Sequence, residues 1–261
     1  ALIAILLHDI GHGPFSHAME HSIVEGVDHE SISLLFMKEL NAVFNQSLTL
    51  AIQIFTGEYP RRFMHQLITS QLDMDRLDYL KRDSFYTGTT EGNINSDRLI
   101  IMLNVVNNEL VIEEKAIYSV EKFLVARRLM YWQVYLHKTS MVAEQLLIRV
   151  LKRAKELIAS GTNLNASKAL SYFLYNKVTE ESFDTRTLSV FSCLDDYDIV
   201  LAMKEWANHD DYVLSNLCKM VINRDLLKVK IKKKKPAKAK IEKHIEQLKQ
   251  KHGLSDKEAS Y

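Results

Sequence analysis

Histidine and carboxylate side chains with the spacing of a metal site are concentrated near the start of the chain. His8 and Asp9 are adjacent, and Asp75 lies in a second acidic stretch. Imidazole nitrogen and carboxylate oxygen suit hard or borderline divalent cations. An isolated His-Asp pair usually carries no function, but three further histidines follow closely, with Gly and Pro between them: His12, His17 and His29. The pattern predicts a metal site that Asp75 closes from a second helix.

Four motifs in order resemble the HD-domain phosphohydrolases, in particular the branch that includes the deoxynucleoside triphosphate triphosphohydrolases. The first is the segment from His8 to His17, and the second is the pair His29-Glu30. The third is an acidic run made of Asp73, Asp75, Asp78, Tyr79 and Asp83. The fourth is an arginine followed by a Tyr-x-His-Lys group: Arg127, Tyr135, His137 and Lys138. The resemblance extends from residue 1 to about residue 230 and implies a mostly α-helical HD-domain bundle.

The resemblance also implies a role for each residue of the site. His8, Asp9 and Asp75 are the implied metal ligands, and the cation would be Mn, Fe, Mg or Zn. Such an ion lowers the pKa of bound water and acts as a Lewis acid toward phosphoryl oxygens. The implied catalytic residues, which contact the scissile α-phosphate or serve proton transfer, are His12, His17 and His29, with Glu20 orienting His29. A carboxylate paired to a histidine fixes its tautomer and raises its basicity.

The resemblance assigns substrate contacts as well. Arg76 and Arg127 match basic positions that bind the triphosphate, where a guanidinium holds two oxygens at once. Tyr79 matches the aromatic residue packed against the sugar, where it would exclude a ribose 2′-hydroxyl. Asp83 matches the acceptor for the 3′-hydroxyl, and we place Tyr135 in the same pocket. Ordinary core packing is an equally good explanation for the two tyrosines.

The family's metal site uses one more histidine, on a helix before the His-Asp pair. The seven residues that precede His8 contain none. Residues 1–7 are an apolar run without a start signal, which is typical of the inside of a helix. We therefore expect the chain to be a fragment of a longer protein.

Helical periodicity dominates the elements that must position these residues. We expect a helix, a Gly-Pro break and a second helix start over 1–23, amphipathic helices over 31–40 and 63–83, and weaker helices over 165–222. A long helix over 119–159 should carry Arg127, Tyr135 and His137. Between them, residues 99–117 read as a β-hairpin around Asn107-Asn108.

This order predicts one large domain with an extension. Residues 1–160 form the HD core with the small hairpin, 161–230 a helical extension of it, and 231–261 a basic connector with the start of a further region. Lys228–Lys240 contains eight lysines. Such a run could bind nucleic acid, but a solvated connector is the better interpretation by about three to one.

The composition of the chain limits the classes of partner that it is expected to bind. The chain has 261 residues, is 47% hydrophobic and has a net charge of +1, so no overall field favours nucleic acid or a membrane. Cys193 and Cys218 are isolated and flanked by apolar residues, which predicts buried free thiols and a cytoplasmic protein. The family also implies a homo-oligomer, of a symmetry that the sequence does not reveal.

We expect a metal-dependent enzyme that hydrolyses a deoxynucleoside triphosphate to deoxynucleoside and inorganic triphosphate. One alternative is an HD nucleotidase or phosphodiesterase that acts on other phosphate esters. Another is a non-catalytic nucleotide-sensing or nucleic-acid-binding module with a vestigial site. Arg127 and the Tyr135 group favour the triphosphate, because a shorter substrate leaves a distant arginine without a partner.

Overall fold

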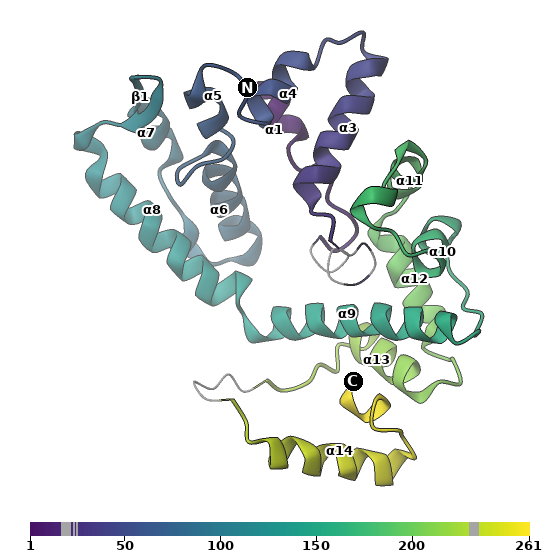
Figure 1. The fold of residues 1–261 in the computed structure, drawn as a ribbon. Coiled ribbons are helices and arrows are strands. Elements are labelled where there is room, and N and C mark those ends of the chain that lie inside the picture. Colours follow the sequence, from purple (N-terminus) through teal and green to yellow (C-terminus); the bar gives the residue numbers. More distant parts are fainter. Residues whose placement is uncertain (17–21, 23, 25, 230–234) are drawn as a thin grey trace.

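In the part of the chain that the structure describes, the protein is an assembly of α-helices with one small β-hairpin at its edge (Figure 1). The computed structural model describes residues 1–16, 22, 24, 26–229 and 235–261. The first half of the described chain holds helices α1 (Leu2–Leu7), α3 (His29–Val43), α4 (Thr49–Phe55), α5 (Arg62–Gln66), α6 (Met74–Thr87) and α7 (Ser96–Ile101), with the short 3-10 turn η1 (Thr90–Gly92). The expected mostly α-helical fold with a small hairpin is confirmed.

The hairpin joins strands β1 (Leu103–Val106) and β2 (Glu109–Ile112), which pair antiparallel. Asn107 and Asn108 connect them with φ of 51° and 67°. Asparagine tolerates this left-handed region better than most residues, and two such residues in succession give the tight turn whose twist matches the strands. The hairpin predicted around these asparagines is therefore confirmed.

The expected helix over 63–83 is two helices in the structure. The two helices are separate because Asp73 caps the start of α6. Its carboxylate accepts a hydrogen bond from the backbone N–H of Arg76 at 2.7 Å. A second bond, from the Ser70 N–H at 3.0 Å, fixes the preceding turn on the same carboxylate. Periodicity alone missed this interruption, since a buried cap does not break the apolar pattern.

The expected helix over 119–159 is also interrupted. The structure has the 3-10 turn η2 (Glu114–Ala116), helix α8 (Ile117–Met130), a π-helical turn η3 (Tyr131–Tyr135) and helix α9 (Lys138–Ala159). His137 is extended, with ψ of 133°, and its ring accepts from the Thr139 N–H at 3.4 Å as the cap of α9. Tyr135 and His137 therefore belong to a bend between helices.

The remaining helices lie on both sides of α9, with α10 and α11 above it and α13 and α14 below it in the view of Figure 1. They are α10 (Lys168–Tyr175), α11 (Thr185–Phe191), α12 (Asp196–Trp206), α13 (Tyr212–Ile222) and α14 (Lys238–His252), with the 3-10 turns η4 (Glu180–Ser182) and η5 (Glu258–Ser260). The helices expected over 165–222 are confirmed, and α14 has no buried residue, as an exposed helix should. No helix in the described ranges combines the length and apolarity that crossing a membrane requires.

Buried side chains of the described residues form three clusters. The largest joins α9 to the helices that follow it. A second contains Leu77 and Leu80 of α6 with Phe123 and Met130 of α8. The third joins Ala4 of α1 to neighbouring helices. Both cysteines are free and Cys218 is buried as expected, but Cys193 is exposed, because it follows the last buried turn of α11.

Candidate functional site

His8 stands where α1 ends and is oriented by its own helix. Its Nδ1 donates a hydrogen bond to the carbonyl oxygen of Ile5 at 2.6 Å, since a carbonyl can only accept. The other nitrogen, Nε2, lies 3.3 Å from Asp9 Oδ2 and 3.7 Å from Asp75 Oδ1. The Asp75 carboxylate is the main cause that raises the pKa of His8 to about 9, against the opposing effect of burial. His8 thus presents a fixed nitrogen to two acids.

Asp75 reaches His8 from the first turn of α6. The start of that helix is set by Asp73, whose side chain is fully buried and caps it. The imidazole of His8 is the largest cause that holds the pKa of Asp75 below its ordinary value. The cap therefore positions a carboxylate that stays ionised opposite His8.

The three predicted ligands come together. One ligand atom from each of His8, Asp9 and Asp75 lies within 4.8 Å of the others. Two atoms that each lie ~2.1 Å from a common ion can be at most ~4.2 Å apart. The distances from His8 Nε2 to the nearest oxygens of Asp9 and Asp75, 3.3 and 3.7 Å, satisfy that limit. The donor set of one imidazole and two carboxylates therefore fits a divalent cation.

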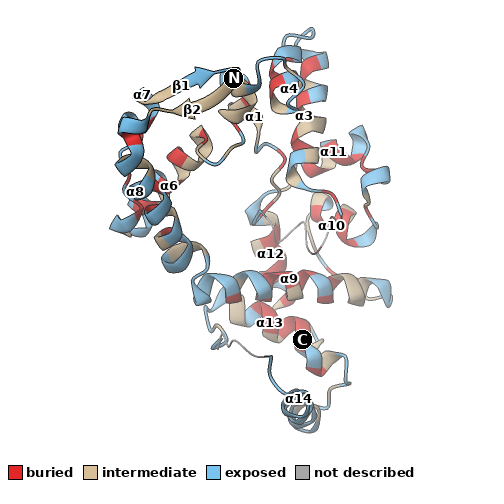
Figure 2. Ribbon diagram, turned by 60° about the vertical axis from the view of Figure 1, so that its left-hand side comes forward, coloured by how far each residue is buried: buried red, intermediate tan, exposed pale blue. Residues whose placement is uncertain are grey.

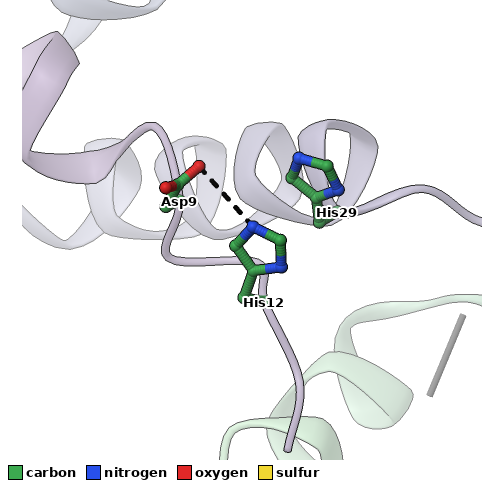
Figure 3. A group of neighbouring side chains, drawn as sticks. All are labelled: Asp9, His12 and His29. Carbon is green, nitrogen blue, oxygen red and sulfur yellow. Dashed lines mark ion pairs between the residues drawn. The ribbon is translucent and has the colours of Figure 1, made fainter. Parts of the chain in front are cut away.

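His12 and His29 lie beside Asp9 (Figure 3). Their rings stack with centroids 4.0 Å apart and an angle of 13° between planes. His12 Nε2 is 3.8 Å from Asp9 Oδ1, so Asp9 faces both His8 and His12. His29 is the first residue of α3, whose start is capped by Asp28. Two of the three histidines expected to contact substrate thus lie beside the three predicted ligands.

Gly11 allows the segment that carries His8, Asp9 and His12 to lie directly on α3. A Cβ atom at residue 11 would meet the carbonyl oxygen of His29 at 2.3 Å and the backbone nitrogen of Ser33 at 2.4 Å. The Gly11 N–H instead donates to Ser33 Oγ at 2.9 Å. Because real Cβ atoms do not approach so closely, only glycine fits here.

A second group of predicted residues, here called the tyrosine wall, consists of Tyr79, Asp83 and Tyr135. The Tyr135 hydroxyl donates to Asp83 Oδ2 at 2.8 Å, and the rings of Tyr79 and Tyr135 meet edge to face at 6.0 Å. Burial is the main cause that raises the pKa of both tyrosines, and the Asp83 carboxylate adds to it for Tyr135. Both hydroxyls therefore stay neutral at physiological pH.

The two predicted arginines differ in their surroundings. Arg127 lies with its guanidinium 5.8 Å from the centre of the Tyr131 ring, beside the tyrosine wall. Arg76 is turned back on its own helix start, where its Nη1 donates to the Ser70 carbonyl at 2.6 Å and contacts the Asp73 carboxylate. The Nε atoms of both are buried and have no hydrogen-bond partner among the described residues. An unpaired buried donor is costly, and a ligand oxygen would relieve it.

His17 and Glu20 lie outside the described residues. The sequence reasoning missed three residues that position the site: Ser33, Asp73 as a cap, and Tyr131, whose ring lies 5.2 Å from that of Tyr135. An aspartate directly before the first apolar residue of a periodic segment, as Asp73 is before Met74, is a usable signal for the cap.

Two family models match the chain. The HD domain matches residues 1–83, and the HD associated region matches residues 94–173. The chain belongs to the HD-domain family. Its HD domain holds His8, Asp9, His12, His29 and Asp75, and the associated region holds Arg127 and Tyr135.

Relatives agree with this assignment. A phosphohydrolase from Bacteroides thetaiotaomicron has a crystal structure that is 56% identical and superposes with a TM-score of 0.96, over 99% of this chain and 64% of its own. The uncharacterized protein YwfO of Bacillus subtilis is 34% identical over 86% of this chain and 52% of its own length. A third relative comes from Dictyostelium discoideum and is named as a deoxynucleoside triphosphate triphosphohydrolase SAMHD1 homolog. It is 25% identical over 64% of this chain and 35% of the relative's length. The chain spans about half the length of the first curated relative, YwfO.

Proposed function

We propose that this HD-domain chain forms the catalytic part of a metal-dependent phosphohydrolase that converts a deoxynucleoside triphosphate to deoxynucleoside and inorganic triphosphate. The observation that carries the proposal is the convergence of His8, Asp9 and Asp75 from α1 and α6, next to stacked His12 and His29. The relative from Dictyostelium named as a triphosphohydrolase supports the substrate class.

His8, Asp9 and Asp75 would hold the cation, which we expect to be Mn, Fe, Mg or Zn. When bound, it would supply Lewis acidity and activate water for attack on phosphorus. The residues of this chain would do the remaining work. His12, His17 and His29 would contact the phosphate and move the proton that the leaving 5′-oxygen requires, and Glu20 would orient His29.

The tyrosine wall would bind the sugar. Tyr79 pressed against C2′ would leave no room for a ribose hydroxyl, and Asp83 would accept the 3′-hydroxyl. Tyr135 donates to the same carboxylate and would fix its orientation. Arg127 and Arg76 carry buried Nε donors, which supports a role in binding the triphosphate. Free thiols agree with a cytoplasmic setting.

Product analysis tests this proposal against its alternatives. The protein is incubated with each deoxynucleoside triphosphate and the matching ribonucleotides, with Mn or Mg, and products are separated by ion exchange. We expect inorganic triphosphate and deoxynucleoside, abolished by Asp9→Ala and by Asp75→Ala. Orthophosphate alone would indicate a different phosphohydrolase, and binding without turnover a nucleotide-sensing module.

A further inference from the structure

The two residues that precede His17 adopt a backbone conformation that their side chains disfavour. Phe15 and Ser16 have φ of 52° and 48°, in the left-handed region. A bulky residue rarely adopts this region, and it stays there only where the surroundings fix the backbone. In the sequence these residues lie between His12 and His17. Their conformation therefore determines how the chain leads from one predicted catalytic histidine toward the next.

The backbone of Phe15, rather than its side chain, has a defined partner. The side chain is 40% exposed and lines a cavity of about 790 Å³ together with Met203. The Phe15 N–H donates to Asp196 Oδ1 at 2.9 Å. The other bond of this turn, from the Ser16 N–H to the Gly13 carbonyl oxygen at 3.0 Å, is local. The bond to Asp196 is thus the one that ties this backbone to a distant helix.

Asp196 is the first residue of α12, and the packing of that helix fixes its position. The helix starts with a capping box formed by Asp195 and Asp198. Its Ile199 is buried in the largest core cluster, which also contains Ile32 of α3. One face of α12 is buried in this way, whereas its start is exposed (Figure 2). The helix that presents Asp196 therefore shares a core with the helix that begins the second motif.

We propose that Asp196 is a positioning residue of the candidate site. It accepts the Phe15 N–H and so holds the loop between His12 and His17 in a conformation that this backbone does not favour by itself. Neither family model reaches Asp196, since the HD domain match ends at residue 83 and that of the HD associated region at residue 173. The effect on catalysis rests on the proposed function, in which both histidines contact phosphate, but the contact itself does not.

Hydrogen exchange tests the contact without any substrate. The amide of Phe15 is followed by NMR in protein that carries isotopically labelled phenylalanine, with its signal assigned from the variant Phe15→Leu. Asp196→Ala should make this amide exchange about three- to tenfold faster, the effect of losing one hydrogen bond of ordinary net strength. Asp196→Asn, which keeps an acceptor oxygen, should retain most of the protection.

Asp198→Ala is the matched control. Asp198 lies in the same first turn and accepts from the Asp195 N–H at 2.9 Å, so its loss weakens the start of α12 without removing the acceptor of Phe15. We expect no change in Phe15 exchange in this variant. Circular dichroism checks that every variant is folded.

Steady-state kinetics with a deoxynucleoside triphosphate and Mn test the consequence for the site. Asp196→Ala should lower kcat about tenfold and change KM less than about twofold, because a small displacement of a catalytic group is costly to the chemical step. Asp196→Asn should keep most of the wild-type kcat, and Asp198→Ala should match the wild type. Metal content should be equal in all variants.

Two kinds of result would overturn the proposal. One is a Phe15 exchange rate or a kcat that Asp196→Ala leaves unchanged, and the other is an equal effect of Asp196→Ala and Asp198→Ala. A wild-type protein without turnover would instead contradict the proposed function. The exchange experiment would then still decide whether Asp196 holds the loop.

Discussion

Asp75 Oδ1 lies 3.7 Å from His8 Nε2, and this contact joins the start of α6 to the end of α1. Neither helix carries a complete site. The ligand set exists only when both helices occupy their native places, so the contact is a sensitive reporter of site geometry.

Replacing Asp75 with asparagine removes a charged ligand at little steric cost. We expect metal affinity to fall at least about a hundredfold, since even the loss of a residue that only orients a ligand costs 10–100-fold. Metal content after dialysis, measured by mass spectrometry, reports the change. Asp78→Asn is the matched control, because Asp78 lies on the same helix, exposed and paired with Arg82. Equal losses in the two variants would contradict the assignment.

Metal affinity should depend on pH through His8. The pKa of this imidazole is raised to about 9, and its proton must leave before a cation binds Nε2. Affinity should therefore increase about tenfold per pH unit below pH 9 and level off above it. Titration calorimetry at several pH values checks this, with the ion's own hydrolysis subtracted. A flat profile between pH 6.5 and 8.5 would contradict the raised pKa of His8 in the metal-free protein.

Gly11→Ala should destabilise the protein without touching a ligand. The new methyl group would clash with the His29 carbonyl and the Ser33 nitrogen, so the segment must move away from α3. We expect a loss of about 1–3 kcal/mol in the free energy of unfolding, together with weaker metal binding. Denaturant unfolding measures the first effect. Ser33→Ala, which removes only the hydroxyl acceptor, should have the smaller effect of the two.

Tyr135→Phe keeps the ring and removes the bond to Asp83. With a deoxynucleoside triphosphate we expect kcat/KM to fall about tenfold or more, since a hydrogen bond to a charged group contributes about 1.5–3 kcal/mol. A substrate that also lacks the 3′-hydroxyl should show little difference between the variant and the wild type. Equal penalties with both substrates would show that Asp83 does not read the sugar.

The contact between α9 and the start of α13 should lose stability in acid. Arg153 is 9% exposed and bonds Asp211 at 2.6 Å and Glu258 at 2.7 Å. Burial would raise the pKa of Asp211, but Arg153 and the Leu214 N–H lower it below 3.8 overall. This contribution to stability is complete above pH ~3.8 and disappears as pH falls through the lowered native pKa.

Urea unfolding at pH 7 and at pH 3 measures this loss. Asp211→Asn should lower stability at pH 7 and leave a smaller difference between the two pH values. An unchanged pH difference in that variant would exclude Asp211 as the source.

Local patterns predicted much of the fold, because they reflect local physics. The Asn107-Asn108 turn and the amphipathic α3 needed only backbone preference and periodicity. The breaks at Asp73 and His137 were missed because each depends on one side-chain cap that does not disturb the apolar pattern. The continuous helices expected there were wrong for this reason.

The sequence predicted which residue types form the candidate site better than it predicted the contacts that these residues make. The sequence indicated His8, Asp9 and Asp75, and the structure brings them together. It could not indicate that Arg76 turns back toward Asp73, because that choice depends on a local acceptor. Nor could it indicate the approach of Gly11 to Ser33, which depends on how α1 and α3 pack. The roles of these residues in catalysis remain predictions.

The predicted ligands also come from two helices that are packed in different hydrophobic clusters. His8 and Asp9 follow a helix whose buried residue, Ala4, belongs to one hydrophobic cluster, whereas Asp75 lies on a helix whose Leu77 belongs to another. A small slide of one cluster against the other changes the ligand spacing before it opens either core. A cation held by all three residues would link the two clusters, so that their position relative to each other would depend on a single bound ion.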